Sequence, residues 1–435
     1  MQETTTRAPR APKPIKPIEI LHEGVTNTWE LVDGAIPKHE MPMFRSFLKA
    51  LKSSLEDIMA KTRKGLPLIG THFAFPSELF FAFDCAPLCF EAISYLPSAL
   101  FTEGAEPFYD LANSFGHPYH TCSAQKGVIG MALKDDFFDV DAIAVPTAPC
   151  DNTMASYSFF SEVKKVPTAV ADMPTYHDKR GYSYFATELK NMVKKVGSII
   201  GQEPNFEGMR KAIGHSSKAI EYLAEVNDLR AAVPCPTESM LNPLGSCAQN
   251  FFAGRPEKEN FYRDVRDVAK ERVKKHVGPP GVEEKIRAFF PYMSVFFDVG
   301  LCEWMDREIG MVNVSDLFNY FFFDPIPPTA SVDEMFDGLA RQSMEYPMTR
   351  QSEGFVDFFL EDSVFLAKKF KADCAIFSVH IGCKQSVGVV QMIREVLRDE
   401  VGIPMLTIEL DIGDKRMTPA ETIKKKIEEF SKTLL

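Results

Sequence analysis

Three of the nine cysteines in the chain share one kind of setting. Cys150 and Cys383 each follow a run that predicts a buried strand and precede a run that predicts a helix, in "VPTAPCDNT" and "SVHIGCKQS". Cys122 lies in the loop "GHPYHTCSAQKG", just before the helical run "KGVIGMAL". In a parallel α/β sheet all such corners face one edge, so residues far apart in sequence can meet there. We therefore expect the three thiols to converge.

Three converging thiolates would form a [4Fe–4S] site with one iron left open. A thiolate at a helix N-terminus is also stabilised by the helix dipole and by backbone N–H groups, which lower the pKa of the thiol. A single free cysteine is more often a small buried hydrophobic residue. The metal-site prediction therefore depends on Cys122, Cys150 and Cys383 taken together, at matching corners.

Three further cysteines are candidates for additional ligands. Cys85 and Cys89, in "DCAPLC", are four residues apart and could share a helical face, but Pro87 between them leaves the geometry open. Cys302, in "DVGLCEW", follows the predicted strand "YMSVFFDVG" at another sheet edge. Packing is favoured over metal binding for the remaining three, Cys235, Cys247 and Cys374.

Histidines lie close to the same cysteines. His117 and His120 come just before Cys122, and His380 comes three residues before Cys383. With an ordinary pKa of about 6.5, a histidine beside a cluster could deliver protons to a reduced substrate, which makes His120 and His380 candidate catalytic residues. An equally good interpretation is that these rings fix the loops through hydrogen bonds.

Several common site motifs are missing from the sequence. It has no paired CxxC elements of a structural zinc site and no CxxxCxxC triplet. It also has neither GxxxxGK[ST] nor GxGxxG. The chain is therefore not expected to hydrolyse ATP by a P-loop or to hold NAD on the usual fingerprint.

The composition limits the class of protein. A chain of 435 residues with 45% hydrophobic and 25% charged residues is typical of a soluble globular protein of two or three domains. The formal net charge of -11, without a concentrated Lys/Arg face, disfavours nucleic-acid binding. The start lacks the apolar region of a signal peptide, and the apolar run "LFFAFDCAPLCF" is too short to span a bilayer. Nine cysteines without a secretory signal fit the reducing cytoplasm.

The elements that must position these residues alternate in type. Residues 1–40 predict an extended N-terminal arm, 41–182 a first α/β domain, 183–280 a helical segment and 281–435 a second α/β domain. The alternation predicts two Rossmann-like parallel-sheet domains. A helix start is expected in "PSELFFAFDCAPLCFEAI", up to Pro87. Strands are expected in "LPLIGTHF", "VDAIAVPTAPCDN", "VPTAVADMP", "YMSVFFDVG", "DCAIFSVHIG" and "PMLTIELD".

A set of short motifs in fixed order resembles a known family. "PSELFFAFDCAP", "HTCSAQKG", "APCDNT" and "HIGCKQ", followed by "IPMLTIELD", are similar to the 2-hydroxyacyl-CoA dehydratase and benzoyl-CoA reductase family. The similarity runs from about residue 65 to the end. It is closest to a catalytic-module (B-type) subunit of ATP-dependent class I benzoyl-CoA reductases.

The resemblance implies a fold, a cofactor and partners. It implies paired α/β domains around an iron–sulfur cluster whose three ligands fall on Cys122, Cys150 and Cys383. It further implies a homologous second catalytic subunit, an acyl-CoA substrate and a separate iron–sulfur activator module that hydrolyses ATP. Ferredoxin would be the upstream electron donor, and this chain would not use ATP itself.

Two departures bear on the choice within the family. Dehydratase relatives usually carry an arginine where this chain has Gln125 and Lys126, and Cys85, Cys89 and Cys302 look like extra thiols for a double-cubane cluster. The leading hypothesis is therefore reduction of the aromatic ring of benzoyl-CoA to a cyclic dienoyl-CoA. The alternatives are a 2-hydroxyacyl-CoA dehydratase subunit, which eliminates water through a ketyl radical, and an electron-transfer subunit that binds no substrate.

Overall fold

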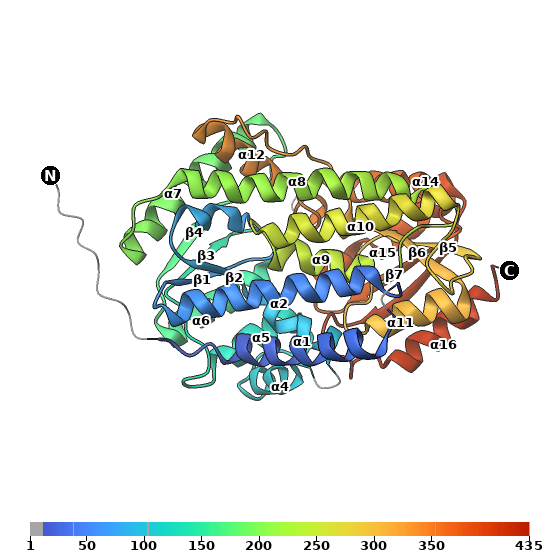
Figure 1. Ribbon diagram of the computed structural model, residues 1–435, viewed down its shortest axis with the longest axis horizontal. Helices are drawn as coiled ribbons and strands as arrows, with labels where there is room; N and C mark the ends of the chain where they lie inside the picture. The colour runs from blue at the N-terminus through green and yellow to red at the C-terminus, as the bar shows by residue number, and fades with distance from the viewer. Residues whose placement is uncertain (1–11, 38, 102–103, 353, 435) are drawn as a thin grey trace.

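The computed structural model describes residues 12–434 except 38, 102–103 and 353. Within this part, eight strands form two four-stranded sheets, and every pairing within the sheets is parallel. The sheets lie toward opposite ends of the long axis of the molecule, and the helices α2, α8 and α10 run lengthwise beside them (Figure 1). The predicted α/β fold class with two parallel sheets is confirmed. The domain boundaries remain predictions.

The first sheet has the strand order β2-β1-β3-β4. Its strands are β1 (Leu68–Thr71), β2 (Ala86–Cys89), β3 (Ala142–Pro146) and β4 (Thr168–Ala171). All side chains of β1 and β3 are buried, as expected for strands covered on both faces. The surrounding helices are η1 (Ser77–Ala82), α3 (Phe90–Leu100), α4 (Glu106–Ser114), α5 (Ser123–Ala132) and α6 (Asp151–Lys164).

The second sheet has the order β6-β5-β7-β8. Its strands are β5 (Ile286–Phe290), β6 (Met311–Asp316), β7 (Cys374–His380) and β8 (Met405–Leu410). The helical elements that follow β5 in sequence are α11 (Val299–Trp304), η2 (Met305–Ile309), η3 (Leu317–Asn319), α12 (Val332–Met344), α13 (Thr349–Ser352), α14 (Val356–Lys369), α15 (Lys384–Val396), η4 (Leu397–Val401) and α16 (Ala420–Ser431). Of these, α12 packs on the core of the first sheet. Between the sheets in sequence come α7 (Lys179–Ile200), α8 (Phe206–Arg230), α9 (Leu241–Phe251) and α10 (Pro256–Lys275).

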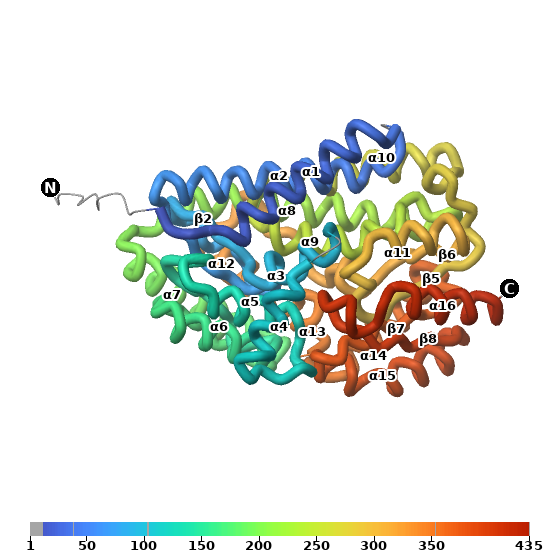
Figure 2. Tube along the Cα trace, turned by 90° about the horizontal axis from the view of Figure 1, so that it is seen from below, coloured from blue at the N-terminus to red at the C-terminus, as the bar shows by residue number. Residues whose placement is uncertain are grey.

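The N-terminal segment differs from the extended arm expected over residues 1–40. Residues Lys16–Ala35 form helix α1, which packs along α2 (Pro42–Arg63), as Figure 2 shows. Ile18, Leu21 and Val25 recur at helical spacing and are buried. The Pro/Lys pattern at the start of this segment masked that periodicity. The first eleven residues of the predicted arm lie outside the described residues.

Two further predictions differ from the structure. A helical turn, η1, forms at the start expected before Pro87, but it ends at Ala82, and the run containing Pro87 forms strand β2 at the edge of its sheet, where proline is tolerated. The predicted strand "YMSVFFDVG" is wrong, because the strand is Ile286–Phe290 and the following apolar residues are buried in a loop. No helix in the described part of the chain is long and apolar enough to cross a membrane.

Candidate functional site

One pocket contains all three cysteines that the corner argument selected. Cys122, Cys150 and Cys383 line it together, and its space between atoms, including the open mouth, is about 660 Å³. Each is the residue immediately before a helix, respectively α5, α6 and α15. The pocket is also lined by residues that follow β1, β2, β5, β6 and β8, so the carboxyl ends of strands from both sheets face it.

The three cysteine corners contact one another directly. The side-chain amide of Asn152, two residues after Cys150, donates to the carbonyl of Gly382 at 3.1 Å. Lys384 forms an ion pair with Asp151 between the same two corners. A Cβ atom at position 382 would collide with the backbone of Cys122, so the corner before Cys383 requires glycine.

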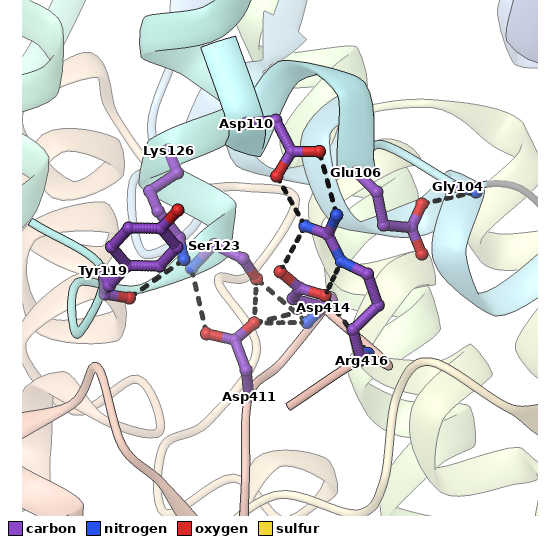
Figure 3. A network of polar contacts seen from close by, with 10 residues as sticks. Gly104, Glu106, Asp110, Tyr119, Ser123, Lys126, Asp411, Asp414 and Arg416 are labelled. Atoms are coloured by element: carbon purple, nitrogen blue, oxygen red, sulfur yellow. Dashed lines mark hydrogen bonds and ion pairs between the residues drawn. The ribbon is translucent and has the colours of Figure 1, made fainter. Parts of the chain in front are cut away.

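A polar network fixes the Cys122 corner to the loop after β8 (Figure 3). The backbone N–H of Ser123 donates to the carboxylate of Asp411 at 3.3 Å, and its hydroxyl donates to the same carboxylate. Farther along this loop, Arg416 pairs with Asp110 of α4 at 2.9 Å. These contacts join the first half of the chain to the second beside the pocket.

Burial controls the protonation of two of the thiols. It raises the pKa of Cys122 well above its usual range, and Asp411 and the neighbouring thiols add to this effect. It raises the pKa of Cys150 to about 11, although the backbone N–H of Thr153 acts in the opposite direction. The Sγ atom of Cys383 lies 3.3 Å from the hydroxyl oxygen of Tyr292. Thiols in such a setting lose their protons when a cation binds, because the cation stabilises the thiolate charge that burial disfavours.

The walls of the pocket are mainly apolar. The apolar side chains come from both halves of the chain: Phe73, Tyr95, Ala124, Tyr292, Met293, Phe296, Phe318, Met348 and Ile412. Polar side chains are fewer: Glu91, Gln125, Ser246, Asn250 and His380. No lysine or arginine is among the described residues that line the pocket. The pocket therefore suits an apolar group beside the thiols rather than an anionic one.

Glu91 is a pocket residue that the sequence analysis missed. Its side chain is buried, and its carboxylate accepts hydrogen bonds from the Tyr157 hydroxyl at 2.7 Å and from the Gln125 amide at 3.1 Å. Burial raises the pKa of this carboxyl group, which favours its protonated form. The sequence signal was a lone acidic residue in the apolar run "PLCFEAI", directly after a strand.

The two predicted histidines occupy different surroundings. His380 lines the pocket and is 4% exposed, and both of its ring nitrogens are buried without a hydrogen-bond partner in the described structure. Burial lowers the pKa of His380 to about 4. His120 is exposed and does not line the pocket. The structure therefore places only His380 of this pair beside the thiols.

The additional cysteine candidates are buried behind or outside the pocket lining. Cys85 donates to the carbonyl of Phe80 at 3.1 Å, Cys89 lies 3.5 Å from Glu91, and Cys302 is buried in α11. None of the three lines the pocket. The strand that was expected to place Cys302 at a sheet edge does not form there.

The described residues contain no group of three or more His, Cys, Asp or Glu side chains arranged to hold a single metal ion. A cluster makes a different demand, because each thiolate binds a different iron atom and the sulfurs stand farther apart than the ligands of one ion. The pocket cysteines have the residue type and the helix N-terminal placement that such ligation requires.

Two parallel sheets that direct their carboxyl ends at a thiol-lined, apolar pocket define an α/β protein whose two sheets share one site. Residues 72–434 match the model of the family described as 2-hydroxyglutaryl-CoA dehydratase, D-component, and the chain belongs to this family. The matched span includes all three pocket cysteines as well as Glu91 and His380. A comparison with curated protein sequences gave no match.

Proposed function

We propose that this chain is the iron–sulfur subunit of a catalytic module that reduces the aromatic ring of benzoyl-CoA to a cyclic dienoyl-CoA. The observation that carries the proposal is the single apolar pocket lined by Cys122, Cys150 and Cys383. Membership of a family described by a CoA-thioester dehydratase supports the substrate class. The same membership supports a complex of several subunits.

The pocket fits a [4Fe–4S] cluster held by three thiolates. Cys122, Cys150 and Cys383 would hold it, and a bound cluster would supply single electrons at low potential. Backbone N–H groups at the helix starts offset the negative charge that such a centre brings into a buried site. Because Cys85, Cys89 and Cys302 line other parts of the core, we propose one cluster in this chain rather than a double cubane.

The pocket residues suit an apolar acyl group. Phe296, Phe318 and Met348 would bind the ring and exclude water from it. Ring reduction takes up two electrons and two protons, and the thioester carbonyl delocalises the charge of the radical anion. Glu91 and His380 are the buried groups positioned to hold or transfer those protons. His120, which is exposed, is not proposed for this role.

We further propose the partners that this chemistry needs. They are a homologous second catalytic subunit and an activator module that hydrolyses ATP, with ferredoxin as the upstream donor. This chain lacks the phosphate-binding motifs, so ATP would be used by the activator.

A second candidate reaction is the dehydration of an apolar 2-hydroxyacyl-CoA. The description of the matching family favours it. In that reaction one electron is returned after water leaves, so electrons are not consumed. The two reactions are separated by measuring electrons consumed per product in the purified complex, with benzoyl-CoA and with 2-hydroxyhexanoyl-CoA. With benzoyl-CoA we expect two electrons to be consumed per dienoyl-CoA formed. Turnover of 2-hydroxyhexanoyl-CoA with far less than one equivalent of reductant would favour the dehydratase.

The cluster assignment is tested by iron and sulfide content and EPR spectra after anaerobic purification with the co-expressed partners. We expect Cys383→Ala to lose iron and change the cluster signal. The matched control is Cys374→Ala, at the opposite end of the segment Cys374–Cys383, because Cys374 is buried in the core away from the pocket. Unchanged iron and spectra in Cys383→Ala would refute the assignment.

A further inference from the structure

A second pocket, here called the side pocket, adjoins the pocket that contains the three thiols. Phe73 lines both, and Asn250 and Gln249, adjacent in α9, line one each. The other walls of the side pocket come from the loop after β1, from η1, α8, α10 and α12, and from residues 321–323. The two pockets therefore adjoin each other at Phe73.

The side pocket connects the interior with the surface. Phe321, Phe323 and Gln342 line it and are partly exposed, whereas its inner residues Glu78 and Lys258 are buried. A long, narrow ligand with one end in solvent could therefore pass these rings and reach the thiol pocket beside Phe73.

Two buried polar groups in the side pocket make fewer contacts than their chemistry allows. Lys258 is 6% exposed, and its ammonium makes no hydrogen bond or ion pair with a described residue, although the charge of Glu78 acts on it from within the same pocket. The side-chain nitrogen of Gln249 donates to the hydroxyl of Tyr262 at 2.6 Å, which leaves its buried Oε1 atom without a donor. Glu78, by contrast, accepts the hydroxyl of Ser216. Unpaired buried polar groups are costly, so a donor and an acceptor remain for a ligand.

We propose that the side pocket binds the pantetheine arm of the acyl-CoA substrate, with an amide carbonyl accepting from Lys258 and an amide N–H donating to Oε1 of Gln249. The inference rests on the proposed function. A carboxylate or phosphate would pair with Lys258 but would leave Oε1 unsatisfied, whereas a secondary amide satisfies both groups. Phe73, Phe75 and Phe321 supply apolar walls for the methylene groups between the amides. The thioester would then meet the thiol pocket at Phe73.

The test uses the complex purified anaerobically with its partners and two probes, S-benzoylpantetheine and S-ethyl thiobenzoate, which lacks both amides. Lys258→Met removes the donor while keeping an apolar side chain of similar length. We expect it to weaken binding of S-benzoylpantetheine about 10-fold or more, as for loss of a hydrogen bond from a charged group, and to leave S-ethyl thiobenzoate unaffected. Lys258→Arg should restore part of the loss. Lys274→Met, at an exposed position on the same helix, is the matched control.

The outcomes separate this inference from the proposed function. Equal weakening of both probes, or no weakening of either, overturns the side-pocket assignment alone. If the wild-type complex binds neither S-benzoylpantetheine nor its 2-hydroxyhexanoyl counterpart, the proposed function fails and this inference falls with it. Should Lys258→Met lose iron or fold poorly, Gln249→Leu removes the acceptor instead, and the same selective loss is expected.

Discussion

At the scale of single residues, the pocket combines thiols with a buried acid, Glu91, which we propose as a proton donor. Glu91 has lost the water that would stabilise its charge, and burial raises the pKa of its carboxyl group. Tyr157 and Gln125 donate to the carboxyl oxygens, which fixes its orientation beside the pocket. A carboxylic acid that stays protonated nearer neutral pH is the form that general acid catalysis needs.

Glu91→Gln tests this role. Glutamine keeps the size and the hydrogen-bonding ability of the side chain but cannot transfer a proton, so we expect turnover to fall by about 100-fold or more with unchanged iron content. Tyr157→Phe is the comparison, because it removes the hydroxyl that contacts Glu91 and the carbonyl of Thr71 but keeps the carboxyl group. The measurement is kcat of the reconstituted complex together with iron content. A kcat within a few-fold of wild type would remove Glu91 from the proton path.

Gly382 is the second residue whose type the site requires. An alanine there would force its Cβ against the backbone of Cys122, so we expect Gly382→Ala to cost about 1–3 kcal/mol of unfolding free energy and to lower iron content. Gly388→Ala, in the next helix, is the control because nothing lies near its Cβ position. That substitution should stabilise the protein by about 0.5–1 kcal/mol, since alanine favours helix. Similar urea midpoints for the two variants would contradict the close contact.

At the scale of elements, helix α1 covers part of the first half of the molecule. Leu21 and Leu31 lie on the same helix, but Leu21 is 1% exposed and Leu31 is 67% exposed. Leu21 lies beside Ile93 and Pro97 of α3, so Leu21→Ala leaves a cavity beneath α1, and we expect a loss of about 2–5 kcal/mol in unfolding free energy. Leu31→Ala should change it by less than about 0.5 kcal/mol. Denaturant titration of both variants measures the difference, and equal stabilities would contradict the burial of this face of α1.

The strands that could be predicted are those whose sequence pattern fits only one kind of secondary structure. β3 and β7 are short, contain β-branched residues and are fully buried, as parallel strands covered on both faces are, whereas β8 is partly exposed at the edge of its sheet. β2 was missed because Pro87 suggests a helix break, and its edge position is visible only in three dimensions. The run after β5 was mistaken for a strand because Tyr292 and Met293 are apolar for a different reason, which is to line the pocket.

The same distinction applies to the site. Cys150 and Cys383 could be paired in advance because parallel topology requires strand-to-helix corners to meet. The same rule was applied to Cys302, but the strand predicted to precede it does not form, and Cys302 lies within α11. Glu91 carries no motif, and its place depends on how β2 and α3 pack against α6. The meeting of the corner cysteines could therefore be predicted from the order of strands and helices. The packing of a side chain such as Glu91 could not.

At the scale of the whole molecule, the pocket is assembled from both halves of the chain. Cys122 and Cys150 belong to the part of the chain that forms the first sheet, and Cys383 follows a strand of the second. The contacts of Asn152 with Gly382 and of Ser123 with Asp411 span the same divide. A cluster bound by all three thiolates would thus link the two halves, with Cys122 and Cys150 on one side and Cys383 on the other, where the halves otherwise meet through packing and hydrogen bonds.

Iron removal should therefore weaken the whole fold rather than one loop. A ligand that binds only the native state raises its stability, so anaerobic chelation of the cluster should lower Tm of the complex measured by calorimetry. In Cys374→Ala, whose substitution lies away from the pocket, chelation should lower Tm by the same amount as in wild type. In Cys383→Ala the starting Tm should already be lower, and chelation should add little, because the link between the halves is gone. A chelation-induced fall of equal size in both variants would mean that the stabilising iron is bound without Cys383.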